Sequence, residues 1–219
     1  MTNRVVRVDH VGTAAEFHAA RPEQAAECTE VHVHELTTPA LVLGSTQSLD
    51  RVDREACAEN GIDVVRRRSG GGAVLLTPGE VGWIDVVIPR GAPGWSADIH
   101  APMVWVGEHL AALFDPDGSV LAVHRGRLVE TEWSRIICFD GVGAGEVLRG
   151  EGKVLGISQR RVRNAARLQC SWYTAYQPGR LVDLLAHPRP SPSELRPVAT
   201  ISAEISRRVP DRLVERLAD

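Results

Sequence analysis

The most distinctive stretch of the sequence is Arg66-Arg67-Arg68-Ser69-Gly70-Gly71-Gly72-Ala73-Val74. Apolar residues predict a short strand before it, over residues 62–66, and another after it, over residues 73–76. Three consecutive glycines between strands cost conformational entropy and contribute no packing, but they allow a ligand to approach the backbone closely. The arginines before them supply charge that suits phosphate or carboxylate. A bulged turn with solvated arginines is the alternative interpretation.

The segments around this loop predict an α/β fold of the α+β kind. Further strands are expected at residues 40–45, 83–88, 135–139, 146–148 and 168–176, and helices at 50–58, 99–114 and 179–186. Asp50 and Asp98 are the expected N-caps of the first two helices. The segment Arg149-Gly150-Glu151-Gly152 is typical of a hairpin turn. Such hairpins favour a mixed, largely antiparallel sheet flanked by helices over a doubly wound parallel one.

Length and composition fit one domain. The chain has 219 residues, of which 43% are hydrophobic and 24% charged, and a net charge of −3. These values indicate a globular protein with a core and give no basic excess that would attract nucleic acid or an anionic membrane. The N-terminus lacks the apolar run of a signal peptide and no long apolar stretch follows, so a cytoplasmic location is expected.

Lysine is almost absent from the sequence. Of the 25 basic residues, 24 are arginine, and Lys153 is the single lysine. Because the planar guanidinium cannot replace a compact ammonium, a lysine retained in such a chain indicates a site that needs a point charge; survival by chance is the alternative. The spacing around Lys153 excludes a Walker A loop, since Val154 follows it, and glycines 141, 143 and 145 do not form a dinucleotide fingerprint.

Together the two motifs resemble one family. The run Arg66-Arg67-x-Ser69-Gly-Gly-Gly-Ala-Val, followed later by Gly152-Lys153-Val-x-Gly156-x-Ser158-Gln159-Arg160, is similar to the lipoate–protein ligase A family. That family belongs to the biotin/lipoyl ligase superfamily, whose mixed sheet is related to class II aminoacyl-tRNA synthetases and biotin ligases. The resemblance makes residues 1–187 the expected catalytic domain. Residues 188–219 are then a linker and C-terminal helices packed on the same domain, with no accessory domain.

The resemblance implies a reaction and a site. A lipoyl or medium-chain acyl group would be activated with ATP and Mg²⁺ and moved from an acyl-adenylate to a lysine of a lipoyl-acceptor domain, from lipoate or octanoate as substrate. Lys153 is implied as the catalytic residue that neutralises charge on the phosphate and carbonyl oxygens. Glu146 is placed where it would contact magnesium or the incoming amine. The implied acyl-adenylate-binding residues are Arg66, Arg67, Ser69, Gly70, Gly71, Gly72, Ala73, Gly156, Ile157 and Ser158.

The sequence also departs from the family pattern. After Gly-Gly-Gly-Ala-Val the family usually has a His and an Asp, whereas this chain has Leu75-Leu76-Thr77-Pro78, and the asparagine usual shortly afterwards is replaced by Glu80 or Val81. A degenerate protein that binds acyl-adenylate or a lipoyl domain without turnover is therefore an alternative. Family members without the accessory domain often need an accessory ligase subunit to make the adenylate, or perform only the transfer, so the resemblance implies one of these two arrangements.

Cys138 supports a second enzymatic hypothesis. Acyltransferases of the same superfamily carry octanoyl or lipoyl groups on a cysteine thioester, and the pair Cys138-Phe139 resembles that branch. A nearby ammonium, that of Lys153, would favour the nucleophilic thiolate. The alternative is an inert cysteine in a buried apolar strand. Cys170, on an alternating strand beside Trp172, is predicted to be a core residue.

Other ionisable residues carry weaker signals. Asp85, within an apolar strand, either faces outward or points toward the pocket, and the outward orientation is favoured. His32 and His34 are predicted to lie on a solvated strand edge rather than at a zinc site. A cluster of arginines either docks an acidic acceptor domain or forms a solvated surface; it comprises Arg160, Arg161, Arg163 and Arg167.

Overall fold

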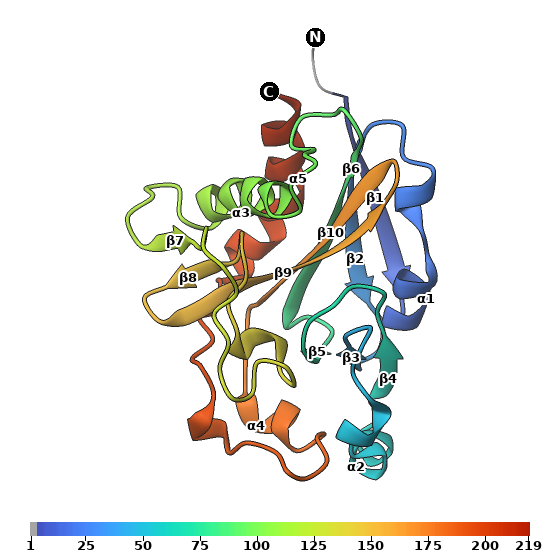
Figure 1. Cartoon of the computed structure of the whole chain (residues 1–219), viewed down its shortest axis with the longest axis vertical. Coiled ribbons are helices and arrows are strands. Elements are labelled where there is room, and N and C mark those ends of the chain that lie inside the picture. Colours follow the sequence, from blue (N-terminus) through green and yellow to red (C-terminus); the bar gives the residue numbers. More distant parts are fainter. Residues whose placement is uncertain (1–3) are drawn as a thin grey trace.

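The computed structural model describes residues 4–219 and contains two β-sheets (Figure 1). The larger sheet has the strand order β1-β2-β6-β10-β9-β8-β7 and the smaller one the order β4-β3-β5. The larger sheet comprises β1 (Val5–Gly12), β2 (Thr29–Leu36), β6 (Val81–Pro89), β7 (Leu121–Val123), β8 (Val147–Arg149), β9 (Gly152–Val162) and β10 (Ala165–Tyr173). The smaller sheet comprises β3 (Ala40–Leu43), β4 (Asp63–Arg66) and β5 (Val74–Leu76).

The sheets are mixed and largely antiparallel, as the sequence predicts. Only the β1–β2 and β3–β4 pairs are parallel, and the remaining neighbours among the described strands are antiparallel. Five α-helices accompany the sheets in the described chain: α1 (Ala14–Ala19), α2 (Arg54–Glu59), α3 (Ala101–Phe114), α4 (Pro178–Val182) and α5 (Ala203–Ala218). None of the helices in residues 4–219 has the length and apolar character needed to cross a bilayer.

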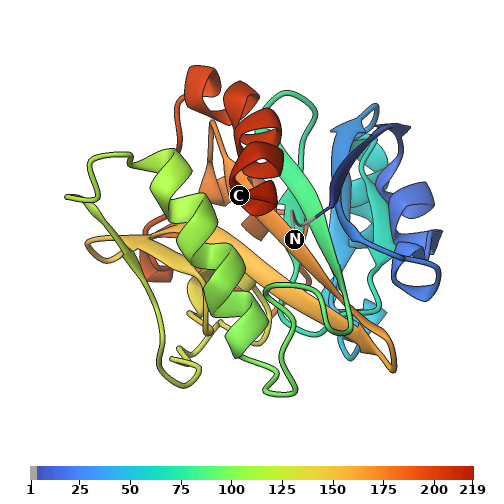
Figure 2. The same cartoon turned by 90° about the horizontal axis from the view of Figure 1, so that it is seen from above.

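The larger sheet is covered on both faces. Helices α3 and α5 lie side by side over one face (Figure 2), where Leu110 and Leu213 pack with Ile84 and Val86 of β6 in one apolar cluster. The smaller sheet and α1 cover the opposite face, where Val42 belongs to a second cluster. Because neither face of β6 meets solvent, this central strand is apolar almost throughout rather than alternating.

The smaller sheet is also buried on both faces. Val42 of β3 points toward the larger sheet, whereas its neighbours Leu41 and Leu43 pack in a third cluster with residues near α2 and α4, such as Cys57 and Leu181. All four residues of β3 are buried. This strand therefore anchors the glycine loop, which follows its neighbour β4, against a rigid interior.

The predicted strand over residues 135–139 is wrong. Ile137 makes a single bridge with Ala73, and a 3₁₀ turn over Cys138–Asp140 follows it. The turn is fixed by contacts that are remote in sequence, because the Asp140 carboxylate accepts a hydrogen bond of 2.7 Å from the backbone of Arg196. The cysteine thus lies on a turn beside the glycine loop, not in a strand.

Two predicted helix caps are also wrong. The side chain that caps α2 belongs to Asp53, which accepts a hydrogen bond from the Ala56 amide, while Asp50 lies in the preceding 3₁₀ turn. Helix α3 begins after His100, and Asp98 accepts from the His100 amide instead of capping the helix directly. Both carboxylates stabilise the approach to a helix rather than its first turn.

Candidate functional site

The glycine loop joins β4 to β5, and two of its glycines are required by the backbone. Gly71 has a φ of 100°, a conformation that favours glycine. A Cβ on Gly72 would lie 2.5 Å from the carbonyl carbon of Ile137, so Gly72 allows that segment to cross the loop. A Cβ on Gly70 would meet nothing within 4 Å. Gly70 therefore has no packing reason to be glycine, and it lines the large cavity described below.

This difference gives a prediction about stability. Gly72→Ala forces a side chain into backbone and should lower the free energy of unfolding by about 1–3 kcal/mol. Gly70→Ala in the same loop should change it by less than about 0.5 kcal/mol, since the space is open. Urea unfolding of the two variants measures both values. Equal effects would contradict the packing roles assigned to these glycines.

The arginines before the glycines differ in their surroundings. The Arg67 guanidinium is buried and donates hydrogen bonds to the carbonyl oxygens of Gly70 (2.8 Å) and Gly72 (2.8 Å), so it braces the loop from within. Arg66 is exposed and donates to the Gln47 carbonyl at the rim. Ser69 donates from its hydroxyl to the Gln169 side chain at 2.8 Å.

Lys153 lies at the start of β9 and is 1% exposed. Its Nζ donates to the carbonyl oxygens of Cys138 (2.8 Å) and Gly141 (2.9 Å) and lies 2.7 Å from a carboxylate oxygen of Glu146. These three contacts use all three hydrogens of the ammonium. The ammonium also lies 5.0 Å from the centroid of the Phe139 ring, within cation–π range. The single lysine is therefore held rigidly as a buried positive charge.

Glu146 fixes both the lysine and the loop before it. One carboxylate oxygen accepts from the Gly143 amide at 2.7 Å and pairs with Lys153, and the other accepts from the Ile157 amide at 3.0 Å. The predicted carboxylate next to the lysine is thus present. Glu146 joins the glycine-rich segment, β8 and β9 around one charge pair.

A large cavity of about 880 Å³ opens over these groups. The glycine loop forms one wall, and Lys153, Glu146 and Ile157 line another part of it. Ala73 does not line the cavity; it receives a hydrogen bond from the Cys138 amide at 2.9 Å and so holds that segment in place. The structure brings together one buried ammonium, open backbone of the glycine loop and a space large enough for a small-molecule substrate.

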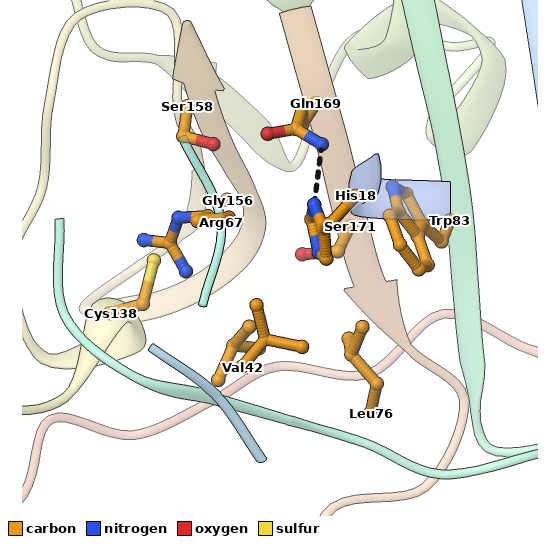
Figure 3. Close-up of a pocket in the computed structure, with 11 residues that line it drawn as sticks. His18, Val42, Arg67, Leu76, Trp83, Cys138, Gly156, Ser158, Gln169 and Ser171 are labelled. Carbon is orange, nitrogen blue, oxygen red and sulfur yellow. Dashed lines mark hydrogen bonds between the residues drawn. The ribbon is translucent and has the colours of Figure 1, made fainter. Parts of the chain in front are cut away.

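A smaller cavity of about 30 Å³ lies under the glycine loop (Figure 3). Gly156 and Arg67 line it, together with apolar side chains such as Val42 and Leu76. Cys138 and Ser158 line both cavities, so they mark the junction between the two spaces. The Cys138 side chain is partly exposed and its thiol is free. The alternative that places this cysteine in a buried strand is therefore wrong, because it lies on a turn and is partly exposed.

The sequence matches the model of a known protein family. The model described as the lipoyl protein ligase A/B catalytic domain matches residues 13–217. The chain belongs to the lipoyl protein ligase A/B catalytic domain family. The match extends beyond residues 35–180, the part covered by the two motifs, and includes α1 and all but the last residue of α5.

Solved structures support the same fold. A lipoate-protein ligase A bound with ATP superposes with a TM-score of 0.74 at 19% identity, covering 99% of this chain and 85% of that one. A putative lipoate protein ligase from T. acidophilum with bound lipoic acid gives 0.72 at 19% identity, with 99% and 86% covered. A bi-partite lipoate protein ligase described with its E2 lipoyl domain, from Thermoplasma acidophilum, gives 0.72 at 18%, with 99% and 84% covered. A search of curated proteins found no significant match.

This member of the lipoyl ligase family has a buried charge network that the sequence did not indicate. Asp85 is fully buried, not outward-facing, and accepts hydrogen bonds from Arg167 Nε (2.7 Å) and Trp83 (2.9 Å). His34 contacts the same carboxylate at 3.1 Å. His32 is buried as well, so the predicted solvated edge is wrong. Among residues 4–219, no group of three His, Cys, Asp or Glu side chains is arranged to hold a metal ion.

Arg167 is a buried anchor and not part of a docking surface. Besides Asp85, it donates to the carbonyl oxygens of Phe17 (2.9 Å) and Ala20 (2.9 Å) at the end of α1. Arginine donors suit the unpaired carbonyl groups at a helix C-terminus. The network therefore fixes α1, which carries His18 into the wall of the small cavity. Cys170 is fully buried, as predicted, and burial raises the pKa of its thiol well above the ordinary value.

Proposed function

We propose that this protein transfers a lipoyl or medium-chain acyl group to a lysine of a lipoyl-acceptor domain through an acyl-adenylate formed with ATP. The observation that carries this proposal is the buried Lys153 ammonium beside the open backbone of Gly70, facing a cavity of about 880 Å³ in a lipoyl ligase fold. ATP and lipoic acid are bound in two structures of this fold. Those ligands support the substrate classes proposed here.

The residues suit both halves of such a reaction. In the first, the acyl carboxylate attacks the α-phosphorus of ATP and pyrophosphate leaves; in the second, the acceptor amine attacks the acyl carbonyl, AMP leaves and the amine loses a proton. Negative charge develops on phosphate and carbonyl oxygens in both steps. Lys153 would stabilise that charge by exchanging one carbonyl contact for a substrate oxygen, in a site where Glu146 already orients it. Open backbone at Gly70 would allow the phosphate to approach.

The protein would offer few oxygen ligands to a magnesium ion. Mg²⁺ commonly uses one or two carboxylates together with substrate phosphates and water. Glu146 lines the large cavity and is the carboxylate nearest Lys153. One Glu146 oxygen already accepts from the Gly143 amide and pairs with Lys153, and the other accepts from the Ile157 amide, so this carboxylate does not fit a magnesium ligand. We propose that the nucleotide phosphates would supply the oxygens for the ion, while Glu146 orients Lys153.

The description of one structural neighbour supports a proposal for the acceptor and for a partner subunit. A structure of this fold is described as a bi-partite lipoate protein ligase with its E2 lipoyl domain. We propose a lipoyl domain as the acceptor of this protein and an accessory ligase subunit as a partner in the activation step.

A thioester transferase is the second candidate function. The observation that favours it is the position of the free Cys138 thiol, which lines both cavities at their junction. An acyl chain that passes from one cavity into the other would pass this thiol. An acyl-carrier protein would be the donor, the thiolate would displace its thiol, and the acceptor amine would then release Cys138. Binding of acyl-adenylate without turnover is the third candidate, favoured by Leu76 and Thr77 where the family has polar residues.

Cys138→Ser separates the first two candidates. The adenylate mechanism predicts that this variant keeps at least half of the parent transfer activity, because the thiol makes no bond in either step. A thioester mechanism predicts a loss of at least about 10³-fold, since the nucleophile is removed. Intact-mass analysis of an apo lipoyl domain, incubated with either lipoate, ATP and magnesium or an octanoyl carrier protein, measures the transfer. Cys57→Ser, at a buried cysteine outside both cavities, is the matched control.

A further inference from the structure

Polar side chains line part of the small cavity, whose wall is otherwise mainly apolar. Its apolar lining comes mainly from Val42, Val74, Leu76 and Trp83. The polar residues that also line it are His18, Arg67, Ser158, Gln169 and Ser171. Buried polar groups are normally satisfied by hydrogen bonds, so each one without a partner needs an explanation.

The hydrogen bonds of Gln169 assign the proton on His18. In the structure the Ser69 hydroxyl donates to Gln169 Oε1 at 2.8 Å, and the amide nitrogen of Gln169 lies 3.3 Å from His18 Nδ1. An amide nitrogen only donates, and Nδ1 must therefore accept. Burial lowers the pKa of His18 to about 3, so the ring is neutral at physiological pH. A neutral ring that accepts at Nδ1 carries its proton on Nε2.

This Nε2–H group is buried and has no partner among the described residues. The ring packs 4.9 Å from Trp83, and the His18 backbone carbonyl accepts from Arg68 at 3.0 Å. In Figure 3 the imidazole lies between Gln169 and Leu76. The Ser171 hydroxyl also lines the cavity and makes no hydrogen bond to a described residue. Leaving a buried donor unsatisfied costs about 1–3 kcal/mol.

We propose that the acyl group bound here carries an oxygen acceptor, a hydroxyl or oxo group, toward its distal end, and that His18 is the specificity-determining residue that donates to it. The cavity holds about 30 Å³, enough for a distal group while the rest of the chain extends past Cys138 into the larger cavity. An alkyl end would leave the His18 donor unpaired, and sulfur is a weak acceptor. That the ligand is an acyl chain rests on the proposed function, whereas the preference for a distal oxygen rests on the cavity alone.

The test compares free acids that differ only by the distal oxygen. Isothermal calorimetry would measure hexanoate against 6-hydroxyhexanoate and octanoate against 8-hydroxyoctanoate, with no nucleotide and no acceptor present. The proposal predicts at least about tenfold tighter binding of the hydroxy acid in one pair, because the partner lacking the oxygen strands a buried donor. Binding of both alkyl acids as tightly as their hydroxy partners would overturn it. This comparison needs only the parent protein.

Two variants test whether the preference for the hydroxy acid comes from the His18 imidazole. His18→Leu should reduce the discrimination to less than about twofold and bind octanoate at least as tightly as the parent, since no donor is then left unpaired. His187→Leu, at an exposed histidine outside the cavity, should leave the discrimination unchanged. Retention of the preference in a folded His18→Leu protein would overturn the role of His18. If the hydroxy acids bind more tightly but no acyl transfer occurs, the proposed function is wrong and this inference stands. If acyl transfer occurs but the hydroxy acids bind no more tightly, this inference is wrong and the proposed function stands.

Discussion

Replacing Lys153 by alanine should abolish acyl transfer, with a rate loss of at least about 10³-fold, because a preorganised charge at a developing oxyanion is removed. The substitution should also destabilise the fold. It leaves the Glu146 carboxylate, which is 4% exposed, without its ion-pair partner, and breaking a buried pair from one side costs about 3–5 kcal/mol. Transfer assays and urea unfolding measure the two effects separately.

The double variant Lys153→Met, Glu146→Gln distinguishes catalysis from folding. It removes both charges, and the glutamine amide oxygen can still accept from the Ile157 amide as Glu146 does at 3.0 Å. Its free energy of unfolding should therefore recover to within about 1–2 kcal/mol of the parent. Transfer should stay at the level of Lys153→Ala. Recovery of activity along with stability would show that the lysine is structural only.

Asp85→Asn should destabilise the core by about 3–5 kcal/mol, since it removes the carboxylate that accepts from the buried Arg167 guanidinium and leaves Arg167 with only Glu23, at 3.8 Å. The loss should release α1 as well, because Arg167 also binds the Phe17 and Ala20 carbonyl groups. Hydrogen exchange of the α1 amides should accordingly become faster. The paired change Asp85→Leu, Arg167→Met would leave the buried Glu23 carboxylate, 3.8 Å from Arg167, without its cation, so Glu23→Gln is added. This triple variant should be more stable than Asp85→Asn, and the opposite result would contradict the pairing argument.

The same carboxylate makes stability depend on pH. Burial alone would raise the pKa of Asp85, but His34 and Arg167 together more than offset burial and lower it below its usual value. A group with a depressed folded-state pKa contributes stability that is complete above its unfolded pKa, about 3.9, and is lost as pH falls below it. The free energy of unfolding should therefore decrease as the pH falls below about 4. Asp85→Asn should show a smaller decrease over this range.

The elements that the sequence predicted well are those with local signals. The glycine loop lies between two strands, and the turn at Gly150, with a φ of 58°, joins β8 to the strand that carries Lys153. Turn residues and apolar runs specify such features within a few positions. The site around Lys153 could therefore be approached from sequence and a family resemblance.

The errors arose where long-range contacts decide the structure. Asp85 was predicted to face outward because a polar residue in an apolar strand usually meets solvent, but β6 has a sheet or helices over each face. Cys138 was assigned to a strand because its neighbours are apolar, whereas Asp140 and Arg196 hold the segment as a turn. His18 gave no signal, since its role depends on Gln169, which is distant in sequence.

Lysine-dependent acyl transfer is tested most directly by supplying preformed lipoyl-adenylate to the purified protein together with an apo lipoyl domain. This substrate removes any need for an accessory subunit in the activation step. Intact-mass analysis should show the lipoyl domain gaining the mass of one lipoyl group with the parent protein, and no gain above the protein-free control with the Lys153→Met, Glu146→Gln variant. Absence of transfer by the folded parent, or equal transfer by that variant, would contradict a lysine-centred acyl transferase.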